Sequence, residues 1–173
     1  MIKLEFEKEM EEKLKKVNGK YITSACVLIN QQGDILACHA TGKPKDRGWD
    51  FPKGMVKEDE SDIFAAMREL QEETDIWLYD QHGLWNKSFN MIDCGIHPHN
   101  KEKNIHIFIY PTFLFPELDQ LKCNTFFEYK GKNIPEVDDY MIIKKEDRSL
   151  FNKVLQDKFN IIDKFNEKHY QAS

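Results

Sequence analysis

Three glutamates near the middle of the chain, Glu69, Glu72 and Glu73, have the side-chain type and the spacing of a metal site. Residues three and four apart share one face of a helix, so the three carboxylates would crowd together. Like charges at that separation repel one another, and hard divalent cations such as Mg²⁺, which bind oxygen ligands, are the usual compensation. The same string also fits the solvated, charged face of an ordinary surface helix. The spacing alone leaves both interpretations open.

The residues on either side extend the pattern from position 54 to position 76. The segment reads G-x5-E-x7-R-E-U-x-E-E-x-D-U, where U is a bulky aliphatic residue. It resembles the Nudix box, which differs only in having glycine where this chain has Asp75. We expect Asp75 to be tolerated, because aspartate is one of the few other residues that adopt a positive φ at a helix C-cap. The matching positions are Gly54, Glu60, Arg68, Glu69, Leu70, Glu72, Glu73 and Ile76.

The resemblance implies a pyrophosphohydrolase that depends on Mg²⁺, or on Mn²⁺ in its place. It implies that the cations are held by Glu69, Glu72, Glu73 and the backbone carbonyl of Gly54. Diphosphate hydrolysis independently calls for cations that neutralise the phosphates and lower the pKa of the attacking water. We expect Glu60 and Arg68 to have a structural role as an ion pair that orients the array.

A second acidic element, I-P-E-V-D-D-Y-M, occupies residues 134–141. It resembles the P-E-x-x-x-W/Y element of RNA 5′-pyrophosphohydrolases in the Nudix family. The resemblance makes Glu136 a candidate metal ligand and general base, with Asp138 and Asp139 as the next candidates. A box glutamate is the alternative base, and a surface acid in a turn after proline is the structural alternative for Glu136.

Upstream of the box, the string W-D-F-P-K-G at residues 49–54 resembles the entry to the box in dinucleoside polyphosphate hydrolases and in the RNA-decapping branch. Lys53 could meet a phosphate oxygen as a point charge. Lys43, Lys45 and Arg47 could do the same from the preceding polar loop, or the loop could simply be solvated. Trp49 could stack on a base, although a core position is the favoured interpretation.

These flanking residues give an order of substrates. We expect a nucleoside diphosphate linked to another moiety, first a dinucleoside polyphosphate and second an RNA 5′ end. A nucleotide-binding Nudix module without turnover is the third interpretation, and the intact box acids argue against it.

The surrounding pattern predicts elements that position these residues. Apolar, β-prone runs at 22–30 and 35–41 predict a hairpin, and further strands are expected at 49–52, 89–94, 105–113 and 140–143. Helical periodicity predicts helices at about 4–16, 60–74 and 148–169. We therefore expect an α/β (α+β) fold, with a mixed sheet between helices, forming a single domain over residues 1–173.

The composition agrees with a non-secreted protein. The chain of 173 residues has a net charge of −5 and no apolar run long enough for a membrane span. Its four cysteines lie far apart, which favours reduced thiols and a cytoplasmic location. The acidity is concentrated in residues 57–75, which have eight acids and two bases. The pattern does not indicate an oligomeric state.

Overall fold

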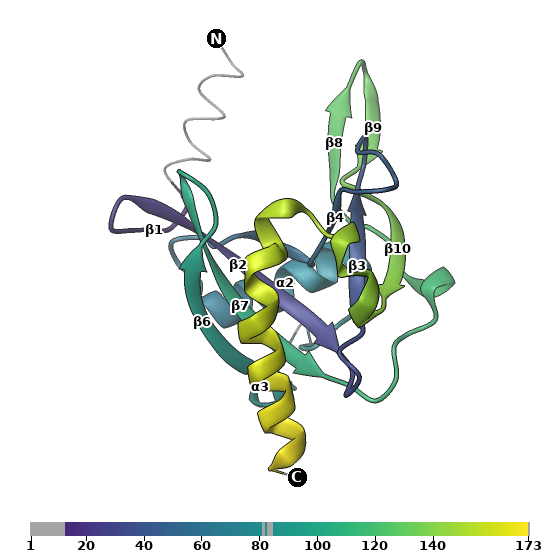
Figure 1. The fold of residues 1–173 in the computed structure, drawn as a ribbon. Coiled ribbons are helices and arrows are strands. Elements are labelled where there is room, and N and C mark those ends of the chain that lie inside the picture. The colour runs from purple at the N-terminus through teal and green to yellow at the C-terminus, as the bar shows by residue number, and fades with distance from the viewer. Residues whose placement is uncertain (1–12, 81, 83–84, 173) are drawn as a thin grey trace.

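The structure is a computed structural model that describes residues 13–80, 82 and 85–172. A mixed, eight-stranded sheet has the central order β10-β3-β2-β7-β6, with three short strands attached beside this path (Figure 1). A separate hairpin, β8–β9, projects from the body. The strands are β1 (Lys16–Val17), β2 (Lys20–Ile29), β3 (Ile35–Ala40), β4 (Trp49–Asp50), β5 (Lys53–Met55), β6 (Ile92–Pro98), β7 (Lys103–Pro111), β8 (Phe126–Tyr129), β9 (Lys132–Pro135) and β10 (Val137–Ile143).

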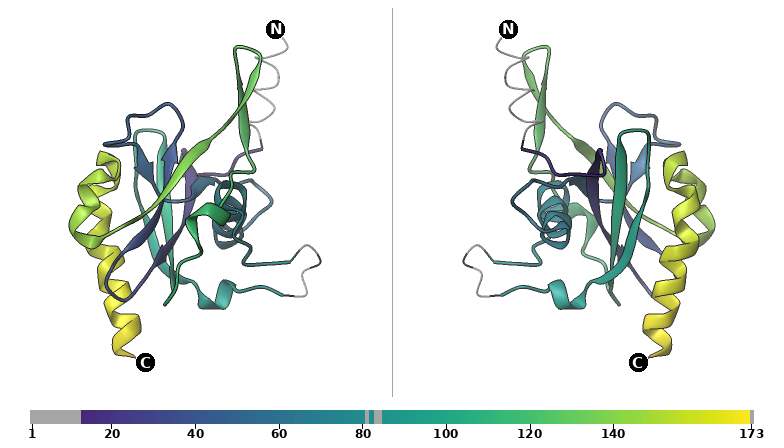
Figure 2. Two further views of the ribbon diagram at one scale, coloured as in Figure 1. Left: turned by 90° about the vertical axis from the view of Figure 1, so that its right-hand side faces the viewer. Right: turned by 90° about the vertical axis from the view of Figure 1, so that its left-hand side faces the viewer.

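Helices cover both faces of the sheet (Figure 2). On one face, α2 (Asp62–Thr74) buries Met67 and Leu70 against Cys26 and Leu28 of β2. On the other face, α3 (Phe159–Gln171) packs Ile162 against the alternate residues of β2. Successive strand residues point to opposite faces, so the apolar residues of β2 contribute to both cores. The expected mixed sheet between helices is confirmed. The 3₁₀ helices are η1 (Ser88–Asn90), η2 (Leu118–Gln120), η3 (Lys145–Leu150) and η4 (Lys153–Lys158).

The expected hairpin between residues 22–30 and 35–41 is largely wrong. The two strands exist, but β2 and β3 pair only at Ile29 and Ile35. Beyond that point β2 pairs in parallel with β7 and antiparallel with β5, while β3 pairs with β10. Long-range pairing thus replaces the local hairpin, because an entirely buried strand needs partners on both of its edges.

The helices at both ends of the chain also differ from the expectation. The helix expected at 148–169 begins only at Phe159, and the 3₁₀ helices η3 and η4 precede it. The kink between them is fixed by Asn152, whose amide donates to the carbonyl of Trp49 over 2.9 Å. Most of the helix expected at 4–16 lies outside the described residues. Its last part is not helical, because Leu14 forms a β-bridge with Lys57 and Lys16 starts β1.

Two smaller segments complete the comparison. The strand expected at 89–94 starts later, at Ile92, after the 3₁₀ turn of η1. The four cysteines are free thiols, as expected. Within the described part of the chain, no helix combines the length and apolar character needed to cross a bilayer.

Candidate active site

Helix α2 presents the box acids on the face that turns away from its core contacts. Its N-cap is Ser61, whose side chain accepts a hydrogen bond from the amide of Phe64 over 3.2 Å. Its C-cap is Asp75, in the left-handed conformation with φ of 63°. The aspartate thus adopts the conformation that was expected at the one position where the box pattern departs from glycine.

Arg68 is the electrostatic centre of the box. Its guanidinium donates to both carboxylate oxygens of Glu60, over 2.6 and 3.0 Å, so the predicted ion pair is present and bidentate. It also donates to Glu69 over 2.7 Å, to Glu72 over 3.0 Å and to the carbonyl of Met55 over 2.9 Å. The Arg68 side chain therefore links Glu60, in the loop before the helix, to Glu69 and Glu72 on the helix.

Gly54 makes room for the carboxylate of Glu69. A Cβ atom at position 54 would overlap that carboxylate, so any larger residue here would displace the Glu69 side chain. Burial raises the pKa of Glu69 to about 7 against the opposing charge of Arg68, and the charges of Glu72 and Glu136 contribute to the rise. The carboxyl group thus lies against the backbone of β5 and in contact with Arg68.

Glu73 lies deeper than the other box acids. Its carboxylate accepts a hydrogen bond from the amide of Lys53 over 3.0 Å, and its backbone carbonyl accepts one from the Tyr140 hydroxyl over 2.5 Å. Burial raises the pKa of Glu73 well above its usual value, although the Lys53 amide opposes the shift. The ammonium of Lys53 pairs with Asp50 over 3.1 Å.

A small pocket of about 150 Å³ brings the two acidic elements together. Glu73 comes from α2 and Glu136 from the segment between β9 and β10, yet both line this pocket. Asp50 and Lys53 form another part of its wall. The pocket is lined by Cys38, Ala40, Asp50, Phe51, Lys53, Glu73, Glu136 and Val137.

The donor set of the site fits a divalent cation. In residues 13–80, 82 and 85–172, no three acidic, histidine or cysteine side chains converge as a finished ligand set. Arg68 and the Lys53 amide instead engage Glu69, Glu72 and Glu73. Burial raises the pKa values of Glu69 and Glu73 even though Arg68 and Lys53 oppose the shifts, so a further positive charge would stabilise both carboxylates. A hard cation with oxygen ligands supplies such a charge.

Asp75 connects the box to Glu136 through two neighbouring residues. Its carboxylate accepts a hydrogen bond from the side chain of Asn124 over 2.9 Å, and the Asn124 amide donates to the carbonyl of Glu72 over 2.6 Å. The next residue, Thr125, donates its hydroxyl to the Glu136 carboxylate over 3.1 Å. The amide of Glu136 in turn donates to the carbonyl of Thr125. Asp75 and Asn124 therefore anchor the segment that holds Glu136.

The candidate phosphate-binding cations separate into two groups. Lys53 lies in the pocket wall and is paired with Asp50, and Lys45 is paired with Asp138 and Asp139, over 3.2 Å each. Lys43 and Arg47 are exposed and form no ion pair with any described residue.

The base-stacking role considered for Trp49 is wrong. Its ring is 1% exposed, packs against His39, and donates its indole N–H to the carbonyl of Lys45. The other two acids considered as metal ligand or general base form contacts with other residues. Asp138 accepts a hydrogen bond from His39 over 2.6 Å, and Asp139 forms an ion pair with Lys45. These contacts leave Glu136 as the acid of its segment that faces the pocket.

Sequence reasoning did not single out Asp50, Asn124 or Thr125. The signal for Asp50 was available, because it stands inside the W-D-F-P-K-G string. Nothing in the sequence marks Asn124 and Thr125. Their importance comes from contacts with Asp75 and Glu136, which lie 49 and 11 positions away in the sequence, respectively.

Comparison with known proteins places this geometry in a family. The model of the NUDIX domain matches residues 20–139. The mRNA-decapping protein g5R of African swine fever virus is 32% identical over 120 residues, which are 66% of this chain and 40% of the viral protein. The chain thus spans about two fifths of the length of the curated relatives that it matches.

Solved structures show the same fold. The MutT protein of Methanosarcina mazei is 19% identical, with a TM-score of 0.54 over 88% of this chain and 99% of that one. The NUDIX domain of Shewanella oneidensis NrtR, solved with ADP-ribose, is 14% identical, with a TM-score of 0.55 over 96% and 99%. With the family model covering residues 20–139, the chain belongs to the Nudix family.

Proposed function

We propose that this protein is a divalent-cation-dependent pyrophosphohydrolase that cleaves the polyphosphate at the 5′ end of RNA. The observation that carries the proposal is the shared pocket of Glu73 and Glu136, acids from the box and from the element that resembles RNA 5′-pyrophosphohydrolases. Nudix enzymes generally use divalent metal ions, and we propose Mg²⁺, with Mn²⁺ as a substitute. The ligands would be Glu69, Glu72, Glu73 and the carbonyl of Gly54, with Glu136 completing the set.

The bound cation would supply charge neutralisation for the phosphates and a lowered pKa for the attacking water. The chain itself supplies positioning. Arg68 and Gly54 hold Glu69 in place, and the Lys53 amide holds Glu73. The ammonium of Lys53 lies in the pocket wall, where it can meet a phosphate oxygen if it exchanges its contact with Asp50.

We propose Glu136 as the general base. It is the exposed acid of the pocket, and its carboxylate is oriented by the Thr125 hydroxyl while it stays clear of Arg68. Glu69, the alternative base, is held by Arg68. If Glu136 is the base, Glu136→Gln loses most of kcat and the acidic limb of the pH–rate profile changes. Nearly full kcat in Glu136→Gln, with a loss of several orders of magnitude in Glu69→Gln, would place the base in the box.

The proposal has two candidate substrate classes. The viral relative is named for mRNA decapping, which favours the RNA 5′ end. Dinucleoside polyphosphates, which the sequence favoured first, are the second candidate, because the W-D-F-P-K-G entry contributes Asp50 and Lys53 to the pocket. Both classes present a nucleoside polyphosphate to the same acids.

The free thiols agree with action in the reducing cytoplasm, and the packing of α3 on the sheet agrees with one domain.

A substrate panel tests the proposal. The protein is incubated with Mg²⁺ or Mn²⁺ and with capped RNA, 5′-triphosphorylated RNA, Ap₄A, ADP-ribose, NADH, dNTPs and diphosphoinositol phosphates, and kcat/KM is ranked. We expect an RNA 5′ end to rank first. A higher kcat/KM for Ap₄A would move the assignment to the second candidate, and no turnover of any substrate would favour a binding module.

A further inference from the structure

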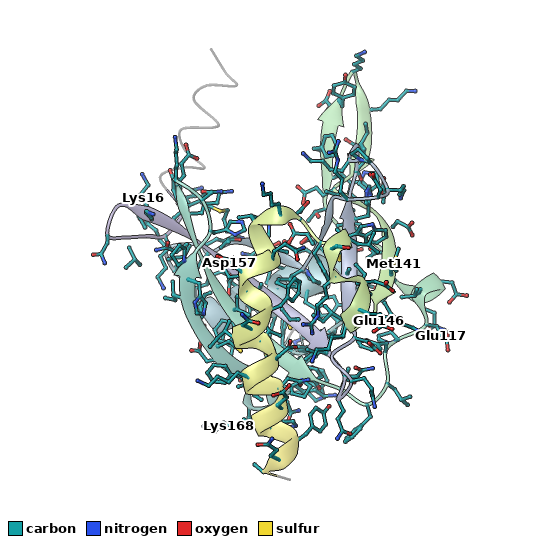
Figure 3. All side chains as sticks on the ribbon, in the orientation of Figure 1. Lys16, Glu117, Met141, Glu146, Asp157 and Lys168 are labelled. Atoms are coloured by element: carbon teal, nitrogen blue, oxygen red, sulfur yellow. The ribbon has the colours of Figure 1, made fainter. Side chains whose placement is uncertain are left out.

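A second cleft of about 570 Å³ lies beside the catalytic pocket, between the loop at 43–48 and the segment η3–η4. In Figure 3 the labelled side chains Glu146 and Asp157 mark η3 and η4, between β10 and α3. A volume of this size is in the usual range for a nucleotide-sized ligand. The cleft is lined by Arg47, Ser149, Phe151, Asn152, Lys153 and Gln156.

One layer of side chains separates the catalytic pocket from the cleft. Asp50 lines the catalytic pocket, and its carboxylate accepts a hydrogen bond from Asn152 of the cleft over 3.2 Å. Phe51 and Phe151 likewise face the pocket and the cleft, with their ring centroids 5.3 Å apart. The catalytic pocket and the cleft therefore lie close together, on either side of this packed layer.

Positive charge in the cleft has no protein partner. Arg47 and Lys153 are exposed and form no ion pair with any residue that the structure describes. In contrast, Lys45 and Lys53, on the same stretch of chain as Arg47, are both paired with aspartates. Two unpaired cations that line one cleft suit an anion, and the planar guanidinium of Arg47 suits a phosphate in particular.

The remaining polar groups suit a ribose or a base edge. Gln156 uses its side-chain N–H groups on the carbonyls of Arg148 and Phe151, which leaves its oxygen as an acceptor at the cleft. Ser149 is exposed and contributes a hydroxyl. Those two carbonyl contacts also fix the shape of the wall, so the cleft is formed before any ligand arrives.

We propose that this cleft binds the first phosphodiester and the following nucleotide of an RNA whose 5′ end occupies the catalytic pocket. The inference rests on the proposed function and extends it to the body of the substrate. A dinucleoside polyphosphate ends after its second nucleoside, whereas RNA continues with a further negative phosphate at each residue. The cleft therefore gives the protein a physical means to prefer RNA over a dinucleotide.

The double variant Arg47→Gln/Lys153→Gln tests the site, with Lys144→Gln/Lys164→Gln as the control. The control also removes two exposed, unpaired cations, but from surfaces outside the cleft. KM is measured on a capped ten-nucleotide RNA and on a dinucleotide cap analogue. We expect the cleft variant to raise KM about tenfold on the RNA and less than twofold on the cap analogue, because two phosphate contacts are lost. The control should alter neither value.

Binding is measured in parallel by fluorescence anisotropy of a 3′-labelled, 5′-monophosphorylated ten-nucleotide RNA at several salt concentrations. The cleft variant should bind less tightly, and its salt slope should be shallower than that of wild type by about 1.4, as expected for two fewer contacts on a single strand. Equal losses on RNA and cap analogue, or unchanged RNA binding and salt slope, would overturn the proposal. If the wild type hydrolyses nothing, the proposed function fails, while the anisotropy arm still decides whether the cleft binds RNA.

Discussion

The box and the second cleft each contain an arginine, and the two arginines differ in burial and in their contacts. Arg68 is nearly buried, and every direction of its guanidinium has a partner among Glu60, Glu69, Glu72 and the Met55 carbonyl. Arg47 is exposed and has no ion pair among the described residues. The arginine of the box is held by its acidic neighbours, whereas the arginine of the cleft has a positive charge that is not paired with any described residue. The difference indicates which residues orient the site and which remain available to a ligand.

The largest effect that separates the two regions should come from Glu73→Gln. The substitution keeps the side-chain shape and an acceptor for the Lys53 amide, but it removes a negative ligand. We expect kcat to fall at least about 1,000-fold on every substrate. Because burial disfavours the charge of Glu73, the melting temperature without metal should not fall. Wild-type turnover in this variant would contradict the catalytic assignment of the box.

Gly54→Ala probes the close contact between β5 and the helix. A Cβ atom would displace the Glu69 carboxylate, whose nearest atom lies 2.1 Å from the position of the added atom. We expect about a 100-fold loss of kcat and a loss of about 1–3 kcal/mol in the free energy of unfolding. Steady-state kinetics and urea unfolding measure the two effects.

A matched pair of substitutions tests the contrast between the arginines directly. Arg68→Lys keeps the charge but loses the fork that binds both oxygens of Glu60, so we expect about 2 kcal/mol of destabilisation. Arg47→Lys should stay within about 0.5 kcal/mol of wild type. Urea unfolding of both variants measures the difference. Equal stabilities would mean that the ion pairs of the box do not hold the fold.

Asp75→Gly restores the family residue and should nevertheless reduce activity. Glycine adopts a φ of 63° without strain. The substitution nevertheless removes the carboxylate that accepts the hydrogen bond of Asn124, and this bond holds the segment before Glu136. We expect about a fivefold loss of kcat with stability within about 0.5 kcal/mol of wild type. Thr125→Val, which removes the hydroxyl donor to Glu136, should give a similar loss. Full kcat in both variants would show that the position of Glu136 does not depend on this link.

The smallest effect concerns Asp62, in the first turn of α2. It pairs with Lys15 and with His106, over 2.7 Å each, and although burial alone would raise its pKa, these partners lower the pKa below 3.8. Its stabilisation is thus complete above about pH 4 and is lost as the pH falls through the lowered pKa. We expect Asp62→Asn to cost about 1 kcal/mol at pH 7 and nothing in strong acid. A constant difference across urea titrations from pH 7 to pH 2.5 would contradict the pairing.

The comparison of regions also explains what the sequence could predict. The ion pair of Arg68 and Glu60 was predictable because both residues occupy defined positions of the box pattern, eight residues apart. The left-handed C-cap at Asp75 followed from local chemistry in the same way. The fold class followed from apolar periodicity, since β2 and α2 have long, clear patterns.

The rest depends on contacts between distant segments. The pairing of β2 with β7 replaced the expected hairpin, and the burial of Trp49 depends on a core that local sequence does not specify. The cleft combines Arg47 with Lys153, more than 100 positions later in the chain, so no motif could reveal it. The one predictable part of the cleft was the polar loop that contains Arg47.

The most direct test of the account is product analysis after hydrolysis of capped RNA in ¹⁸O-labelled water. Mass spectrometry identifies which phosphate acquires the heavy oxygen. We expect a nucleoside diphosphate from the cap and a 5′-monophosphorylated RNA, with one labelled oxygen among them, and no products from Glu73→Gln. Intact RNA with the wild-type enzyme and Mg²⁺ or Mn²⁺, or release of inorganic phosphate alone, would contradict it.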